Sequence, residues 1–298
     1  MTPRPSNPNK TEGSHIRTIE PPDIPYSRPD KFRFYAMGDE HLGPIHCDED
    51  LLRETIKEIE NDENARWGNV GDMADLITPQ DFKRWDGAIL ANWLKGHENN
   101  IGMTQVNHAY ELFKKVWGKC LFLLDGNHEE SIRRCHSFDF TTNLREKIKE
   151  NQGIDIPYGD SQAMIALKFR RSTKEVHQIL IHARHGEGHA RTSGARANAV
   201  LRLAVSFPTT HIILMGHLHG QEAPDIPQRL IYQSGKIKSY GGIATMTGAW
   251  LRAYMQNVPA SYAERWGCTP SVLGCPRILI EPDKGKMTYE KVVMVREV

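Results

Sequence analysis

The sequence predicts an α/β domain built in layers, because two kinds of segment alternate along the chain. Five short apolar runs have the length of buried strands, and glycine or polar residues end each of them. Stretches with apolar residues at helical spacing lie between the runs. Strands that alternate with helices are typical of layered α/β folds. The five runs cover residues 32–37, 67–70, 120–124, 179–181 and 212–215.

Four stretches between these runs are predicted to be helices. In the first, Leu52 and Ile56 share one face, and Asp48 is suited to cap the N-terminus. In the second, Trp85 and Trp93 stand at helical spacing, so we expect their rings in the core. The four stretches cover residues 48–60, 82–94, 106–116 and 195–204.

The pattern changes after Gly220, where three further runs look like strands without long helices between them. We expect these runs to add antiparallel strands that complete a second sheet. They cover residues 229–233, 277–280 and 286–295.

The chain of 298 residues is predicted to form one domain behind a flexible N-terminal arm. Residues 1–30 are rich in Pro, Asn, Ser and charge, and they contain too little apolar surface to offset the entropy of ordering. The predicted domain spans residues 31–298, a length that a single large core can fill.

Composition argues against several classes of protein. The formal net charge is +1, which gives no strong field for nucleic acid, although a local basic groove stays open. Five cysteines without CxxC spacing indicate a reducing compartment rather than a disulfide framework. No apolar stretch reaches the length of a signal peptide or a membrane span. We therefore expect a soluble, cytoplasmic protein with no membrane partner.

Side chains that bind metals follow every apolar run, at the strand ends where α/β folds usually place ligand sites. Asp39 and His41 are two residues apart, so in an extended backbone they point the same way and can hold one ion together. His217 and His219 repeat this spacing after the fifth run. The other candidates are Asp72 after the second run, Asn127 and His128 after the third, and His185 after the fourth.

These residues lie in five short motifs that resemble, in the same order, the motifs of calcineurin-like metallophosphoesterases. Five motifs in order, each after an apolar run, make a specific signal, whereas any single one of them is weak. The flanking sequence is similar to members carried by bacteriophages and prophages. The motifs are Gly38-Asp39-Glu40-His41, Gly71-Asp72, Gly126-Asn127-His128-Glu129, His185-Gly186 and Gly216-His217-Leu218-His219.

The resemblance implies a four-layer αββα sandwich, in which two mixed β-sheets are flanked by helices. It also implies a site for two divalent metal ions bridged by Asp72, where hydroxide between the ions attacks a phosphate mono- or diester. The ligands implied for the first ion are Asp39, His41, Asp72 and His219. Those implied for the second ion are Asp72, Asn127, His185 and His217.

His128 has a different role in this resemblance. The histidine of the Gly-Asn-His motif faces the substrate, where it protonates the leaving oxygen or stabilises the phosphate, and Glu129 is the residue expected to orient it. Arg133 and Arg191 follow ligand motifs closely and are candidates for binding a substrate phosphate. Solvated surface charge explains these two arginines equally well.

The fourth motif leaves a choice between two histidines. His182 lies directly at the end of the apolar run, and His185 is followed by Gly186. We favour His185 as the ligand, because the His-Gly turn matches the motif.

Mn²⁺ is the first expectation for the metal, and the nitrogen and oxygen ligands also suit Zn²⁺, Fe or Ni²⁺. Asp75 stands where purple acid phosphatases carry a tyrosine ligand, so their iron site is not expected. Two other functions stay open: a DNA or RNA nuclease of the same superfamily, and a non-catalytic interaction module on the same fold. The physiological phosphate ester and the oligomeric state do not follow from the sequence.

Overall fold

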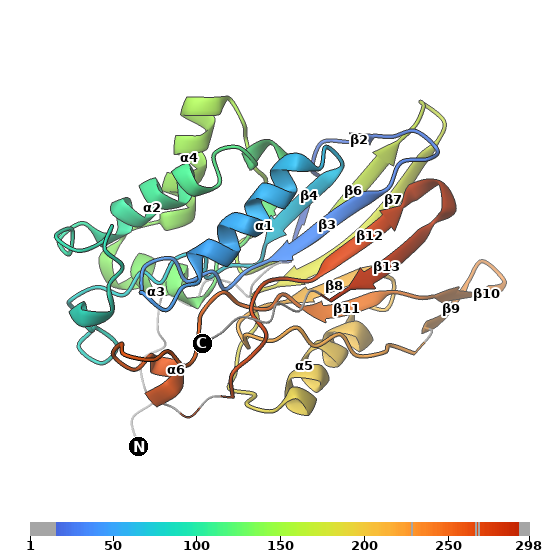
Figure 1. Ribbon diagram of the computed structural model, residues 1–298. Helices are drawn as coiled ribbons and strands as arrows, with labels where there is room; N and C mark the ends of the chain where they lie inside the picture. Colours follow the sequence, from blue (N-terminus) through green and yellow to red (C-terminus); the bar gives the residue numbers. More distant parts are fainter. Residues whose placement is uncertain (1–15, 228, 266, 268, 292–298) are drawn as a thin grey trace, which may run out of the picture.

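Two mixed sheets packed face to face form the centre of the protein, and helices cover both outer faces (Figure 1). The computed structural model describes residues 16–227, 229–265, 267 and 269–291. The predicted four-layer αββα arrangement is confirmed. Within the described residues, no helix has the length and apolar character needed to cross a membrane.

The first sheet has the strand order β13-β12-β3-β4-β5. Strands β3, β4 and β5 run parallel, whereas β12 runs antiparallel to both β3 and β13. The runs expected after Gly220 do form antiparallel strands, but they do not complete the second sheet as predicted: residues 277–281 and 286–290 extend this first sheet, and residues 229–233 pair with residues 236–240 in a separate hairpin. The strands are β3 (Phe32–Met37), β4 (Ala65–Asn69), β5 (Cys120–Leu123), β12 (Arg277–Glu281) and β13 (Lys286–Glu290).

The second sheet has the order β1-β6-β7-β8-β11, and β2 also pairs with β6. Strands β7, β8 and β11 run parallel, and the long hairpin of β6 and β7 is antiparallel. The strands are β1 (Arg17–Ile19), β2 (Ile24–Pro25), β6 (Gln162–Arg170), β7 (Val176–Arg184), β8 (Ile212–Met215) and β11 (Ile243–Met246).

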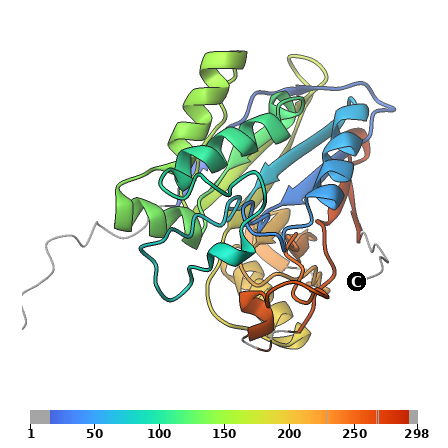
Figure 2. The same cartoon turned by 60° about the vertical axis from the view of Figure 1, so that its left-hand side comes forward.

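Helices form the two outer layers (Figure 2). Helices α1, α2 and α4 pack on the first sheet, where Leu52 and Val106 share a core with Trp67. Helix α5 covers β8 and β11 of the second sheet through Val200 and Ala204. The helices are α1 (Glu49–Asn61), α2 (Ile101–Leu112), α3 (Asn127–His136), α4 (Phe140–Gln152) and α5 (Ser193–Ser206).

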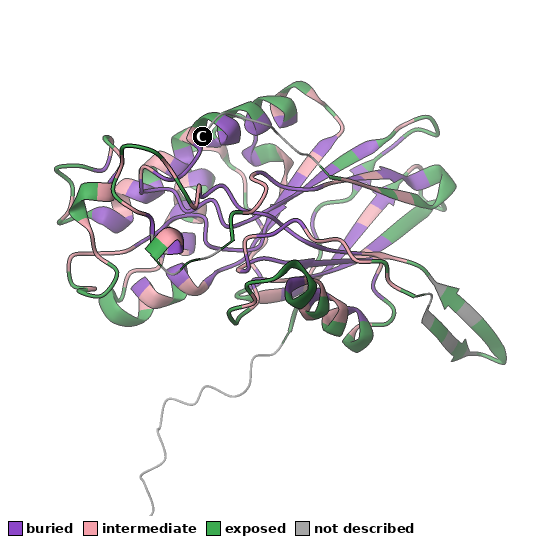
Figure 3. Ribbon diagram, turned by 60° about the horizontal axis from the view of Figure 1, so that its bottom comes forward, coloured by how far each residue is buried: buried purple, intermediate pink, exposed green. Residues whose placement is uncertain are grey.

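Shorter elements complete the fold. A hairpin of β9 and β10 extends from the body of the protein (Figure 3). The elements are β9 (Arg229–Gln233), β10 (Lys236–Tyr240), α6 (Tyr262–Arg265) and the 3₁₀ turns η1 (Gly87–Ile89), η2 (Trp117–Lys119) and η3 (Pro282–Lys284).

Strand β3 explains why its apolar run is nearly continuous. Phe34 and Ala36 face the core between the two sheets, whereas Tyr35 and Met37 face the core beneath α1. A strand covered on both faces needs apolar residues at successive positions. This burial fixes the end of β3, and hence the backbone that leads into Asp39.

The helix predicted for residues 82–94 is wrong. This segment forms turns and the short η1, and the side chain of Phe82 is 91% exposed. Asp81 and Asp86 accept hydrogen bonds from the backbone N–H groups of Arg84 and Ala88. Such side-chain bonds satisfy the backbone in turns and compete with a helix.

The domain boundary predicted near residue 31 lies too late. Strands β1 and β2 precede it and pair with β6, and Ile24 and Tyr26 are buried. Residues 17–19 and 24–25 are therefore part of the second sheet. The rest of the expected arm, residues 1–15, lies outside the described residues.

Candidate metal centre

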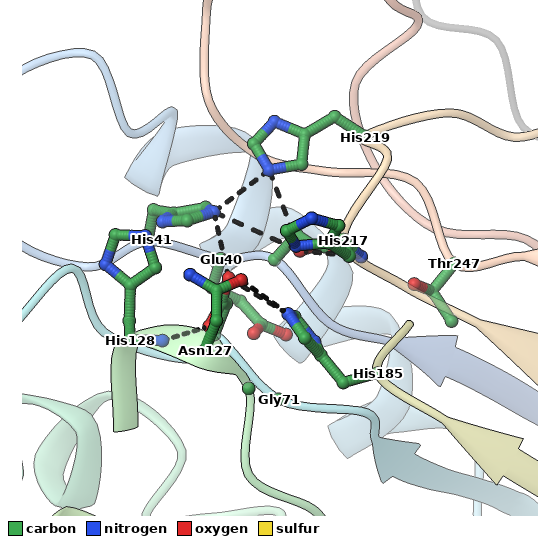
Figure 4. A network of polar contacts seen from close by, with 12 residues as sticks. Glu40, His41, Gly71, Asn127, His128, His185, His217, His219 and Thr247 are labelled. Atoms are coloured by element: carbon green, nitrogen blue, oxygen red, sulfur yellow. Dashed lines mark hydrogen bonds and ion pairs between the residues drawn. The ribbon is translucent and has the colours of Figure 1, made fainter. Parts of the chain in front are cut away.

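Strands from both sheets end at one edge, and the loops that follow them bring the candidate ligands together (Figure 4). Five of these residues have a positive φ between 49° and 69°. Non-glycine residues rarely adopt this conformation, which costs on the order of 1–3 kcal/mol each and is concentrated at functional sites. The five residues are Asp39, His41, Asp72, His217 and His219.

A first cluster of donor atoms joins the loop after β3 to the loop after β8. The Nε2 atoms of His41 and His219 lie 3.0 Å apart. The Oδ1 atom of Asp39 lies 3.6 Å from Nε2 of His219 and 4.0 Å from Nε2 of His41. The backbone N–H of His217 donates to the Asp39 carboxylate at 2.8 Å and so fixes its orientation.

A second cluster lies beside the first, and its Asp72 also lies near His41 of the first cluster. The Oδ2 atom of Asp72 lies 3.2 Å from Nε2 of His185 and 3.9 Å from Nε2 of His41. Asn127 places its Oδ1 atom 3.1 Å from the same His185 nitrogen. His217 also brings a ring nitrogen within 4.8 Å of the donor atoms of Asp72 and His185.

The chemistry of these donors fits metal ions. The Nδ1 atom of His185 donates to the carbonyl of Val70 at 3.0 Å, and Nδ1 of His41 donates to Asp75 Oδ1 at 3.3 Å. In the neutral form of each ring, the Nε2 atom then carries the lone pair, and it faces other acceptors. Buried acceptors that converge in this way need a cation between them, and histidine ligands of metals are typically held by such a second hydrogen bond.

The electrostatics of the site also favour added positive charge. Burial alone would lower the pKa of His185, but the Asp72 carboxylate outweighs it and raises the pKa to about 10. Burial likewise opposes charge on His41, yet the bond to Asp75 and the charge of Asp72 raise its pKa to about 9. The carboxylates thus create a negative potential that a divalent cation would satisfy.

The two histidines after β8 are neutral, which is the form that binds metals. Burial, followed by the nearby His185, lowers the pKa of His217 to about 4. Burial and the neighbouring His41 hold the pKa of His219 well below its usual range. Both residues can therefore offer a nitrogen lone pair near neutral pH.

Glu129 holds the loop of Asp72 in place. Its buried carboxylate accepts hydrogen bonds from the backbone N–H groups of Asp72 and Met73, both at 2.9 Å, and of Gly126 at 2.8 Å. The sequence predicts that Glu129 orients His128, whereas these bonds join the loop after β4 to the turn before α3. The two segments are so close that a Cβ on Gly71, whose φ is +105°, would lie 2.3 Å from the Gly126 nitrogen.

His128 lies at the N-terminal end of α3 beside the two clusters. Its Nδ1 donates to the carbonyl oxygen of Asp75, and its backbone N–H donates to Asp72 Oδ1 at 2.9 Å. Its ring packs edge-on against His41, with ring centroids 4.8 Å apart. Asp75 therefore orients both histidines, a role that sequence reasoning missed, and its position three residues after Asp72 is the signal for it.

The structure brings His185, and not His182, to the site. His182 is fully buried and stacks on Phe207 with ring centroids 3.8 Å apart. Neither of its ring nitrogens has a hydrogen-bond partner among the described residues. It faces α5 rather than the metal ligands, so it belongs to the packing of the second sheet.

The two candidate arginines differ in their surroundings. The guanidinium of Arg133 pairs with the buried carboxylate of Asp125 and contacts the hydroxyl of Tyr158 at 3.5 Å. Asp125 also accepts from Thr141 Oγ1 at 2.6 Å, so Arg133 is part of a structural network. This pairing removes the basis for expecting Arg133 to clamp substrate. Arg191 is exposed in the loop before α5 and stays a candidate.

No protein-family model and no curated protein matches this sequence. A Streptococcus pneumoniae protein described as a predicted phosphoesterase is 12% identical over 84% of each chain, with a TM-score of 0.34. Vps29 from Entamoeba histolytica, solved with Zn²⁺, is 12% identical over 88% of this chain and 99% of that chain, with a TM-score of 0.39. The calcineurin-like phosphoesterase YfkN from Bacillus subtilis is 11% identical over 74% and 82%, with a TM-score of 0.31.

Similarity at this level does not assign the chain to a family. Membership of the calcineurin-like superfamily and the likeness to phage-encoded members therefore stay predictions.

Proposed function

We propose that this protein is a metal-dependent phosphoesterase of the calcineurin-like superfamily that hydrolyses phosphate mono- or diesters. One observation carries the proposal. The Asp72 carboxylate lies between His41 and His185, and the second nitrogen of each histidine is fixed as a donor to a group behind it. This arrangement suits a carboxylate shared by two cations.

In this proposal, two groups of four residues hold the ions. The first group is Asp39, His41, Asp72 and His219, and the second is Asp72, Asn127, His185 and His217. When bound, the two ions supply the positive charge that attracts phosphate oxygens and activates a water molecule. Only Asp39 and Asp72 carry negative charge among these ligands, so a loaded site stays positive and attracts an anionic ester.

The chain itself would position the reacting groups. His128 uses Nδ1 to bind the Asp75 carbonyl, which leaves Nε2 as the atom that can hold a proton for the leaving oxygen. Glu129 accepts hydrogen bonds from the backbone N–H groups of Asp72 and Gly126, and so holds Asp72 at a fixed position relative to Asn127. Asp39, Asp72 and His185 are buried, and their low exposure to water strengthens these electrostatic contacts.

Mn²⁺ is our first choice of metal, because the carboxylate and amide oxygens suit it, and Zn²⁺, Fe and Ni²⁺ are alternatives that the imidazole donors suit. The test is hydrolysis of 4-nitrophenyl phosphate and bis(4-nitrophenyl) phosphate by purified protein with Mn²⁺. We expect turnover that a chelator abolishes and that fresh Mn²⁺ restores. Protein that binds Mn²⁺ and hydrolyses neither class of ester would support a non-catalytic module instead.

A further inference from the structure

Residues 78–86 form an ordered loop next to the metal centre. The backbone N–H of Asp81 donates to the Thr78 carbonyl at 2.9 Å, and that of Trp85 donates to the Asp81 carbonyl at 2.8 Å. The Asp81 carboxylate accepts from Nε of Arg84 at 2.6 Å. These local bonds fix the conformation of the loop.

The loop is fastened to the helix that carries Asn127. Arg84 Nη2 donates to Ser131 Oγ at 3.1 Å, and Thr78 Oγ1 contacts His136 Nε2 at 3.0 Å. Ser131 follows Asn127 by four residues, so the two lie on the same face of α3, about 6 Å apart along its axis. Through Ser131, the loop therefore contacts the side of α3 that carries Asn127.

Within this fastened loop, Phe82 presents its ring to solvent. Its side chain is 91% exposed, more than any other large hydrophobic residue described as exposed. Lys83 is exposed beside it. A single exposed apolar residue is common on protein surfaces. Here, however, the backbone around the ring is already ordered, so a ligand that covers the ring would cause little further loss of entropy.

The inner side of the loop has no room for a second aromatic ring. Arg84 and Trp85 line a cavity that reaches Asp75, but its volume is about 10 Å³. That volume is enough for roughly one water molecule. An aromatic group that contacts this loop therefore has room only on its outer surface, where Phe82 is exposed.

We propose that Phe82 is a stacking platform for the nucleobase of a phosphate-ester substrate. The proposal rests on the proposed phosphoesterase function, and it names nucleobase-bearing esters as the substrate class. Aromatic side chains beside cationic ones are the usual means of binding single-stranded nucleic acid, because every base has a π-face and every nucleotide has a phosphate. With a phosphate at the metal centre, the adjoining base reaches Phe82 and Lys83 attracts the next phosphate.

Steady-state kinetics on matched substrates test this proposal. The substrates are a dinucleotide phosphodiester and its abasic counterpart, which keeps the sugars and the phosphate. Stacking contributes about 1–3 kcal/mol per base, so Phe82→Ala should raise KM for the dinucleotide by about 5- to 150-fold. Its KM for the abasic diester and both kcat values should stay unchanged, and Phe82→Trp should retain the low KM.

Val205→Ala is the matched control, because Val205 is 78% exposed on α5, which packs on the other sheet. It should change neither KM. An equal rise of KM on both substrates, or no rise on either, would overturn the stacking role while the phosphoesterase function stands. A change in sedimentation of Phe82→Ala without a change in KM would also overturn it, since it would show that the ring contacts a second copy.

A third substrate distinguishes nucleic acids from single nucleotides as the molecules that carry the base. A short single-stranded oligonucleotide that loses more affinity than the dinucleotide in Phe82→Ala would identify nucleic acid, and an equal loss would identify nucleotides. If no ester is hydrolysed, the proposed function fails, and binding of AMP to the Mn²⁺-loaded protein decides the stacking role. The parent must then bind AMP about 5- to 150-fold more tightly than Phe82→Ala, and equal affinities would overturn the role.

Discussion

The carboxylate of Glu129 accepts a hydrogen bond from the backbone N–H of Asp72 at 2.9 Å, and so links the loop after β4 to helix α3. The same carboxylate accepts from Met73 and Gly126, which makes it the common acceptor for two strand-end loops. The position of Asp72 therefore depends on a residue that is not itself expected to bind metal.

Glu129→Gln should weaken metal binding by about 10- to 100-fold, as is usual when the partner of a ligand is lost. The amide nitrogen of the glutamine is a donor and cannot accept a hydrogen bond from a backbone N–H. One buried N–H group would lose its acceptor, which should lower the free energy of unfolding by about 1–3 kcal/mol. Isothermal titration with Mn²⁺ and urea unfolding measure the two effects. Glu130→Gln is the control, because Glu130 is exposed and pairs with Arg134; similar behaviour of the two variants would show that Glu129 does not position the loop.

His185→Ala should lose most of the activity, because it removes a donor that faces both Asp72 and Asn127. His182→Phe should keep the activity, since its ring lies against Phe207 and away from the clusters. Comparison of kcat and bound Mn²⁺ for the two variants checks this prediction. Full activity in His185→Ala would remove His185 from the ligand set.

The buried ring of His182 should make the protein less stable in acid. Burial lowers its pKa from 6.5 to about 4 in the folded state. Between pH 6.5 and pH 4, the unfolded chain therefore binds the proton more tightly than the folded protein does. The neutral ring leaves stability intact above about pH 6.5, and up to about 3 kcal/mol is lost as the pH falls toward 4.

His182→Phe keeps an aromatic ring at this position and cannot take up a proton. The difference in the free energy of unfolding between parent and variant should therefore grow in favour of the variant from pH 6.5 to pH 4. Urea unfolding at several pH values measures this difference. A difference that does not change with pH would contradict the prediction.

His128→Ala should bind metal normally and lose rate in a way that depends on the leaving group. General acid catalysis contributes about 10²- to 10⁴-fold, and a basic alkoxide needs a proton far more than 4-nitrophenolate does. The loss of kcat should be much larger for alkyl esters than for 4-nitrophenyl esters. Equal losses would indicate that His128 stabilises charge on the phosphate, and loss of metal would indicate that it is a ligand.

The strands that lead into the site could be predicted closely from the sequence. Residues 32–37 and 212–215 are predicted as strands and form β3 and β8 with the same bounds. Their apolar runs are buried on both faces and stop at glycine, so local sequence determines them. Parallel strands end at one edge, which is why the motifs after them come together.

Contacts made by loops could not be predicted in the same way. The bonds of Asp75 to His41 and of Glu129 to Asp72 depend on backbones with positive φ values, which sequence periodicity does not report. The apolar pattern of the sequence does not predict helix α3, because the helix buries only one apolar residue, Ile132. Its other buried residues are polar and lie at its start. In segment 82–94, by contrast, the spacing of the tryptophans predicts a helix that does not form. Turns capped by aspartate side chains take its place.

The number of Mn²⁺ ions bound per chain by the parent and by Asp72→Asn tests the central claim most directly. Equilibrium dialysis followed by elemental analysis measures it, with Asp155→Asn as a control at an exposed carboxylate. A carboxylate shared between both clusters predicts two ions in the parent and in the control, and loss of tight binding at both positions in Asp72→Asn. Two tightly bound ions in Asp72→Asn, or a single ion in the parent, would contradict a shared dinuclear site.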